Sequence, residues 1–306
     1  MSGHGDTYIP PPRSQPSGLR PPRCKLAARM LVGVAQIEPR LGERERNREV
    51  CLGRLEEAAA AGCSLLVLPE CASSGYVFES FDEAAPHAEE IPGPFIGALE
   101  EACRRLGVHC VAGMLERDGD RLRNTAVLVG PDGLVGRYRK SHLPFLGVDR
   151  FVAAGDELDV FETPLGRIGM EICYDLRFPE LTRALALRGA DIVAHPTNWP
   201  MAARSNADLL TRARAQENRI FLLTANRVGR ERDGEFCGWS QICDVRGDRL
   251  VEAGETGEGV FLAEIDVEEA RAKDIVPVPG RYEMHLFGDR RPELYGALVA
   301  EKTAVP

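Results

Sequence analysis

Three residues that suit nucleophilic catalysis each stand at the end of a strand-like run. Cys173 closes an apolar run, and a proline-opened helix is predicted to follow it at once. Glu70 and Lys140 each close a further strand-like run. A thiol attacks only as a thiolate, so it needs a base to take its proton and it gains from a nearby cation. The residue types therefore indicate a cysteine nucleophile at the carboxyl end of a sheet, served by a carboxylate and an ammonium group.

These residues lie in three motifs: Leu-Pro-Glu at 68–70, Tyr-Arg-Lys-Ser-His-Leu-Pro at 138–144 and Cys-Tyr-Asp-Leu-Arg-Phe-Pro-Glu at 173–180. In this order, and with 70 and then 33 residues between the three key positions, the motifs resemble the nitrilase superfamily of carbon–nitrogen hydrolases. The resemblance covers residues 31–266. It implies a triad in which Glu70 is the general base, Lys140 the transition-state cation and Cys173 the nucleophile.

The chemistry that this triad implies is acyl transfer. Cys173 attacks an amide carbonyl, the amine leaves as a thioester forms, and water then hydrolyses the thioester. Glu70 takes the thiol proton, gives it to the leaving nitrogen and later activates water. The backbone N–H of Tyr174 and the ammonium of Lys140 are the candidate donors to the oxyanion. No cofactor is expected, and no metal, because the sequence holds no His-x-x-x-His or Cys-x-x-Cys pair.

Two histidines, His142 and His195, offer the alternative of a Cys–His pair. A lone histidine near the end of a strand is more often a hydrogen-bonded structural residue, so we predict that neither is the base. Elsewhere, Arg214 and Glu217 stand at helical i,i+3 spacing and are predicted to form a structural ion pair.

Asp149 marks a departure from the family that the motifs resemble. Many relatives carry a second glutamate between the lysine and the Pro-Gly or Ala-Gly turn that closes this loop. Here Asp149 is the only acid before Ala154-Gly155. Two interpretations stay open: Asp149 replaces that glutamate and orients Lys140, or it forms a surface turn with Arg150.

The residues after Cys173 bear on the substrate. Nitrile-hydrolysing members of the family typically have Trp-Glu there, whereas Tyr174-Asp175 looks more like the amidase branch, including omega-amidase-like enzymes. The resemblance thus favours a small aliphatic amide, cleaved to ammonia and a carboxylate. N-carbamoyl compounds are the nearest alternative. Nitrile hydrolysis, thioester hydrolysis and a non-catalytic scaffold are further ones, although a scaffold would be expected to lose a triad residue.

Loops near the triad are expected to form the substrate pocket, with walls from Tyr76, Phe145, Asn198, Trp199 and Met201. Asn198 follows a strand-like run within Pro-Thr-Asn-Trp-Pro. Its amide therefore either binds the substrate or stabilises its own turn.

Alternating strand and helix signals surround these residues and predict an α/β architecture. Helices are expected at 43–61, 94–106, 179–187, 201–218 and 267–273. Strands are expected at 31–36, 65–68, 108–114, 124–129, 134–138, 168–172, 191–194, 220–225, 241–245 and 260–265. Periodicity does not separate a sandwich from a doubly wound sheet. The resemblance implies a four-layer α-β-β-α sandwich, in which helices cover the outer faces of two facing sheets.

Composition limits the class of protein. The chain has 306 residues, 44% of them hydrophobic, which suffices for one large α/β domain. Its net charge of -9 argues against a nucleic-acid or anionic-membrane surface, and no apolar run is long enough for a membrane span. The nine cysteines are odd in number and lack paired spacing. We expect a cytoplasmic protein with buried free thiols, including Cys51, Cys63, Cys103 and Cys110.

Three segments are expected along the chain. Residues 1–29 are rich in proline and arginine and are predicted to be a disordered tail. Residues 30–275 are expected to form the carbon–nitrogen hydrolase domain, and residues 276–306 an extension that packs on this domain or on a partner subunit. The resemblance also suggests a homodimer or a higher homo-oligomer, paired through helices near the active site.

Overall fold

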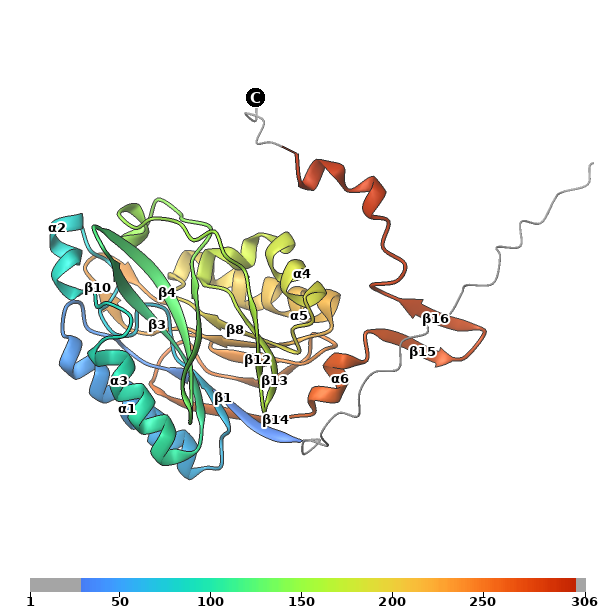
Figure 1. Cartoon of the computed structure of the whole chain (residues 1–306), viewed down its shortest axis with the longest axis horizontal. Coiled ribbons are helices and arrows are strands. Elements are labelled where there is room, and N and C mark those ends of the chain that lie inside the picture. The colour runs from blue at the N-terminus through green and yellow to red at the C-terminus, as the bar shows by residue number, and fades with distance from the viewer. Residues whose placement is uncertain (1–28, 301–306) are drawn as a thin grey trace, which may run out of the picture.

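The computed structural model describes residues 29–300. Within this range the chain forms two six-stranded sheets that face each other, with helices outside both (Figure 1). The predicted four-layer α-β-β-α sandwich is confirmed. The predicted N-terminal tail lies, except for Arg29, outside the described residues.

Both sheets combine parallel and antiparallel strands. The first has the order β14-β1-β2-β3-β4-β5, with β1 (Met30–Gln36), β2 (Leu65–Val67), β3 (His109–Asp118), β4 (Arg121–Gly130), β5 (Gly133–Arg139) and β14 (Gly259–Ile265). The second has the order β13-β12-β9-β8-β7-β6, with β6 (Val160–Thr163), β7 (Gly166–Met170), β8 (Ile192–Pro196), β9 (Phe221–Ala225), β12 (Gln241–Cys243) and β13 (Arg249–Glu252). Strands β1 to β3 run parallel, as do β7 to β9.

Helices cover the outer face of each sheet. The first sheet carries α1 (Arg44–Ala60) and α3 (Pro94–Leu106), and the second carries α4 (Pro179–Leu187) and α5 (Thr211–Asn218) (Figure 1). Side chains alternate between the faces of a strand, and β2 illustrates the result. Leu65 and Val67 join the core between the sheets, whereas Leu66 joins the core beneath α1 and α3.

Two predicted helices have the observed bounds, namely 94–106 for α3 and 179–187 for α4. Each begins with a proline in its first turn, where the missing N–H costs nothing. Gly107 ends α3 with a φ of 71°, a left-handed conformation that glycine adopts without steric cost. These punctuating residues explain why the sequence located both helices.

One expectation at the predicted nucleophile is wrong. The strand before it ends at Met170, and Cys173–Arg177 form a 3₁₀ helix, so the proline-opened helix does not follow Cys173 at once. The predicted helix at 201–218 is confirmed as a helical segment without a break, although its geometry changes along its length. It begins as a 3₁₀ turn at Met201–Ala203, contains a π-helical turn at Asn206–Leu210 and ends as α5.

Several short elements were not predicted because they span too few residues to show a period. They comprise β6, β13, the hairpin of β10 (Arg230–Glu231) and β11 (Gly234–Glu235), the hairpin of β15 (Asp274–Val278) and β16 (Tyr282–His285), and α2 (Phe81–Ala84). The predicted helix at 267–273 is shorter, as α6 (Val267–Arg271). The β15–β16 hairpin projects away from the sandwich (Figure 1). The domain boundary at 275 stays a prediction.

All eight cysteines among residues 29–300 are buried and free of disulfides, which confirms the buried thiols predicted for Cys51, Cys63, Cys103 and Cys110. Within the same range, every helix is too short or too polar to cross a membrane.

Glu70 leaves β2 in a turn that packs directly on β3. The contact is at Gly113, whose N–H donates to Pro69 O at 3.1 Å and whose O accepts from Ala72 N at 2.9 Å. A Cβ at Gly113 would lie 2.5 Å from the Glu70 Cα and 2.7 Å from the Cys71 N. These neighbours are backbone atoms and have little freedom to move. Gly113 thus fixes the position of Glu70 because it has no side chain.

We expect Gly113→Ala to lower the free energy of unfolding by about 1–3 kcal/mol, as overpacked cores do. Gly97→Ala is the matched control, because Gly97 lies in α3 with nothing within 4 Å of its Cβ position. This control should stabilise the protein by up to about 1 kcal/mol. Urea unfolding of both variants measures the difference. Equal stabilities would contradict the close packing at Glu70.

Candidate active site

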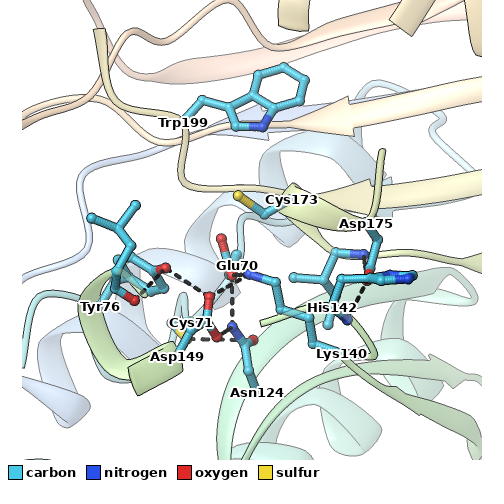
Figure 2. A network of polar contacts seen from close by, with 12 residues as sticks. Glu70, Cys71, Tyr76, Asn124, Lys140, His142, Asp149, Cys173, Asp175 and Trp199 are labelled. Carbon is cyan, nitrogen blue, oxygen red and sulfur yellow. Dashed lines mark hydrogen bonds and ion pairs between the residues drawn. The ribbon is translucent and has the colours of Figure 1, made fainter. Parts of the chain in front are cut away.

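The three predicted residues meet at the carboxyl ends of their strands (Figure 2). Lys140 donates from Nζ to Glu70 Oε1 at 2.7 Å, and both side chains are fully buried. Cys173 lies beside this pair, and the charges of both Glu70 and Lys140 act on the pKa of its thiol. Strand direction explains the meeting. β2 belongs to the first sheet and β7 to the second, and β5 runs in the same direction as β3 because β4 is antiparallel to both.

Asp149 completes the cluster. Lys140 Nζ donates to Asp149 Oδ2 at 2.6 Å, and the aspartate is buried within a 3₁₀ turn at Gly147–Arg150. Of the two interpretations left open by the sequence, the structure therefore favours the one in which Asp149 orients the lysine. The surface-turn alternative is wrong, because only 3% of Asp149 is exposed.

Asn124 is a member of the cluster that the sequence did not reveal. Its Nδ2 donates to Glu70 Oε1 at 2.7 Å and to Asp149 Oδ1 at 2.8 Å. Its backbone O accepts from Lys140 N at 2.8 Å. One amide therefore links both carboxylates to the strand that carries the lysine. The available signal was an asparagine at the start of the predicted strand 124–129, since this residue type is depleted in strands.

Burial sets the protonation of these groups. It raises the pKa of Glu70, against the opposing effects of Lys140 and Asn124. Burial acts to lower the pKa of Lys140, but Asp149 and Glu70 outweigh it and raise that pKa well above its ordinary value. Lys140 therefore stays an ammonium ion.

The Cys173 thiol keeps its proton at rest. Burial, and then the charge of Glu70, raise its pKa, whereas Lys140, the Thr197 hydroxyl and the Asn198 N–H act to lower it. Glu70 Oε1 is occupied, but Oε2 has no hydrogen-bond partner among residues 29–300. The cluster thus holds a protonated thiol next to a carboxylate oxygen that is free to accept a proton.

The backbone at Cys173 is unusual. Its φ is 49°, in the left-handed region that residues other than glycine rarely occupy. Such conformations cost of order 1–3 kcal/mol and cluster at functional sites. Here the turn directs the chain from β7 into the 3₁₀ helix Cys173–Arg177. The role of the Tyr174 N–H at the oxyanion stays a prediction.

The five residues predicted for the pocket occupy different positions. Tyr76 is buried, and its hydroxyl donates to Asp149 Oδ2 at 2.8 Å and approaches Leu146 O at 3.0 Å. Tyr76 therefore holds Asp149 in place by a hydrogen bond. Phe145 is 91% exposed and Met201 is 42% exposed. Their contact with a substrate stays a prediction.

Asn198 and Trp199 are buried beside the site. Neither atom of the Asn198 amide has a hydrogen-bond partner in the described part of the chain, so no bond supports its turn-stabilising alternative. Substrate binding by this amide remains the open prediction.

The two histidines have other partners than the thiol. His195 is buried, with Nδ1 at 3.2 Å from Thr224 Oγ1 and Nε2 at 3.3 Å from the Cys173 O. Burial lowers its pKa to about 4. His142 binds Asp175 instead. The predicted structural role of both residues agrees with these contacts.

The predicted ion pair between Arg214 and Glu217 is confirmed, with 3.1 Å between Nη1 and Oε1. Arg214 also donates from Nε to the Leu176 O at 3.0 Å, so it ties α5 to the 3₁₀ helix that follows the cysteine.

His195 makes stability depend on pH. It must stay neutral in the folded protein down to about pH 4, whereas in the unfolded chain it binds a proton near its ordinary pKa of 6.5. Its contribution is present above pH 6.5 and is lost as the pH falls to 4, by about 3 kcal/mol. We expect His195→Gln to lose less stability than the wild type across this window in urea unfolding. Parallel pH dependences would contradict the assignment.

The chain is similar in sequence to known proteins. The model of the carbon-nitrogen hydrolase family matches residues 31–274. A protein of Pyrococcus abyssi named nitrilase is 40% identical over 86% of this chain and 98% of the relative. The human omega-amidase NIT2 is 32% identical over 79% of this chain and 88% of the relative.

A solved structure is similar as well. It is a variant of the amidase from Nesterenkonia sp. AN1, 25% identical, which superposes with a TM-score of 0.73 over 92% of this chain and 99% of that one. The family match, the sequence identity and the architecture all indicate the same family. The chain therefore belongs to the carbon–nitrogen hydrolase family of the nitrilase superfamily and is an enzyme of that family.

Proposed function

We propose that this enzyme hydrolyses the C–N bond of a small aliphatic amide through a thioester on Cys173, releasing ammonia and a carboxylate. The observation that carries the proposal is the free Oε2 of a buried Glu70 beside a protonated thiol. Glu70 Oε2 takes the thiol proton as sulfur attacks the carbonyl carbon. The same carboxyl group then protonates the leaving nitrogen, and the C–N bond breaks.

Lys140 stabilises the oxyanion in this proposal. An ammonium group has three N–H donors. Two are directed at Glu70 Oε1 and Asp149 Oδ2, which leaves one for the negative oxygen that develops on the substrate. Because the side chain is fully buried, this charge acts in a medium of low dielectric constant, where it is worth more than in water.

The relative from Nesterenkonia supports a nucleophilic cysteine. In a variant of that amidase, the acetamide moiety of fluoroacetamide is covalently added at the active site cysteine. The names of the human relative and of this amidase support an amide as substrate.

A second candidate is nitrile hydrolysis, because the Pyrococcus relative at 40% identity is named a nitrilase. A thiol can add to a nitrile carbon to form a thioimidate; one water then releases ammonia and leaves a thioester, and a second water releases the carboxylate and the free thiol. The two substrates share the nucleophile and the product, so direct assay has to separate them.

We expect ammonia release from short aliphatic amides, with slower or no release from the nitriles of the same acyl groups and from N-carbamoyl compounds. Cys173→Ala should abolish turnover, and Glu70→Gln should lower kcat by at least 100-fold. Both substitutions are close to the original residue in size, and circular dichroism checks their folding. Turnover of nitriles alone would replace the proposal by the second candidate, and activity in Cys173→Ala would end both.

We also propose a reducing cytoplasmic location. The support is the set of eight free, buried thiols among residues 29–300.

The chain is further proposed to associate with a second copy of itself through its C-terminal extension. Residues beyond α6 leave the sandwich as an arm, which carries exposed apolar side chains such as Leu294 at 66% and Leu298 at 62% exposure. A hollow of about 600 Å³ separates the arm from α4 and α5. The arm side of this hollow carries apolar side chains, whereas the side of α4 and α5 is lined by Pro179, Glu180, Arg183 and Glu217. A single chain thus leaves the apolar surface of the arm uncovered, and a second copy presents a surface of the same kind.

We expect the wild type to elute with twice the chain mass of 33.5 kDa in size-exclusion chromatography with light scattering. Leu298→Asp should shift it toward the single chain, since a charge would enter the apolar contact. Leu250→Asp is the control, because Leu250 is also exposed, at 42%, but lies on β13. A monomeric wild type, or equal behaviour of the two variants, would refute the role of the arm.

A further inference from the structure

One carboxylate joins the lysine motif to the cysteine motif. Asp175 is fully buried, and its Oδ2 accepts from the Tyr138 hydroxyl at 2.9 Å and from Ile172 N at 3.0 Å. Its Oδ1 accepts from His142 N at 3.0 Å and lies 2.7 Å from His142 Nδ1 (Figure 2). Four hydrogen bonds therefore converge on a single side chain.

The positions of these donors are informative. Tyr138 and His142 stand two residues before and two residues after Lys140, and Ile172 immediately precedes Cys173. The lysine follows β5 of the first sheet, whereas the cysteine follows β7 of the second. Asp175 thus connects the two sheets at the point where the ammonium group and the thiol must face each other.

The chemistry of the connection requires a carboxylate. An ionised carboxylate only accepts hydrogen bonds and offers about four lone-pair sites. All four contacts of Asp175 use donors, with His142 donating from Nδ1. An asparagine has the same shape but replaces one oxygen by an NH₂ group, which would face either Tyr138 and Ile172 or both groups of His142. Asp175→Asn must therefore lose at least one hydrogen bond, either to the Ile172 side or to the His142 side.

Aromatic packing holds the His142 ring, which binds one side of Asp175. The His142 ring stacks on Phe178, with 3.7 Å between ring centroids and 9° between planes. Phe178 in turn packs edge-on against Tyr174, at 5.2 Å. The imidazole that binds Asp175 therefore also packs on Phe178, the residue before α4, and Phe178 in turn contacts Tyr174, the residue after the nucleophile.

We propose that Asp175 is a positioning residue that sets the separation of the Lys140 ammonium from the Cys173 thiol. The inference rests on the proposed function, in which both groups act on one substrate carbon. Asp175 acts through its hydrogen bonds to the chain segments that flank Lys140 and Cys173. In this proposal it touches neither the substrate nor the reacting atoms.

Lys140 is the group whose displacement can be measured. Its charge acts to lower the pKa of the Cys173 thiol. A lysine held less closely lowers that pKa less, so the thiol ionises at higher pH. Alkylation by N-ethylmaleimide, which is not a linear amide, reports this ionisation without any substrate.

In Asp175→Asn we expect kcat to fall at least tenfold with KM changed less than twofold. We also expect alkylation of the Cys173 peptide, followed by mass spectrometry, to shift to higher pH. Asp244→Asn is the matched control. Asp244 is equally buried and accepts from the N–H groups of Arg246 and Asp248 in the turn between β12 and β13. It should lose stability but keep the wild-type alkylation profile.

The alkylation profile separates this inference from the proposed function. If the wild type turns over no amide or nitrile, the profile still decides the role of Asp175. A wild-type profile and wild-type kcat in a folded Asp175→Asn would overturn it. If that variant does not fold, Tyr138→Phe decides, since it removes one of the four donors; an unchanged profile and kcat there would overturn the inference as well.

Discussion

The buried ammonium group of Lys140 is the charge on which the rest of the site depends. Removing an ion from water costs several kcal/mol, and only closely placed opposite charges offset that cost. Glu70 and Asp149 supply them at 2.7 and 2.6 Å. Two carboxylates around one cation leave an excess of negative charge, which Asn124 and Tyr76 moderate with their N–H and O–H donors. Each member of the cluster therefore offsets part of the free energy that it costs to bury the others.

The fold brings these charges together from distant parts of the sequence. Glu70 and Cys173 follow strands of different sheets, and both lie at carboxyl ends that share one edge of the sandwich. Lys140 reaches the same edge because two antiparallel turns of chain separate β5 from β3. Packing is close enough that Gly113 has no room for a methyl group beside Glu70. The reacting groups are thus fixed by the backbone of regular elements more than by loops.

Much of this arrangement could be predicted from the sequence. Residue type, strand ends and the resemblance of three motifs to the nitrilase superfamily located Glu70, Lys140 and Cys173, and proline and glycine marked the ends of α3. The role of Asp149 could not be decided, because its burial depends on how the 3₁₀ turn Gly147–Arg150 folds back onto Lys140. An aromatic residue in a loop reveals its apolar ring but not the direction of its hydroxyl, so Tyr76 was assigned to the pocket.

Polar residues that act through several partners were the hardest to find. Asn124 lies inside a strand and Asp175 follows the nucleophile, and neither position shows in a hydrophobic period. Their contacts span 54 and 37 residues of sequence. Only tertiary structure shows that one amide serves both carboxylates, or that one carboxylate serves both motifs.

The protonation states explain how the proposed cysteine mechanism can work without a histidine base. His195 is close to Cys173, but its burial lowers its pKa to about 4 and its Nε2 faces the Cys173 O rather than the thiol. The same burial raises the pKa of Glu70 and so makes that carboxylate a stronger base than it would be in water. A dry site therefore weakens an imidazole as a base and strengthens a carboxylate. In the proposed mechanism the thiol stays protonated until a substrate arrives, and its proton then goes to Glu70 Oε2, which has no hydrogen-bond partner among residues 29–300. Desolvation of the cluster thus favours glutamate over histidine as the base that we propose for this nucleophile.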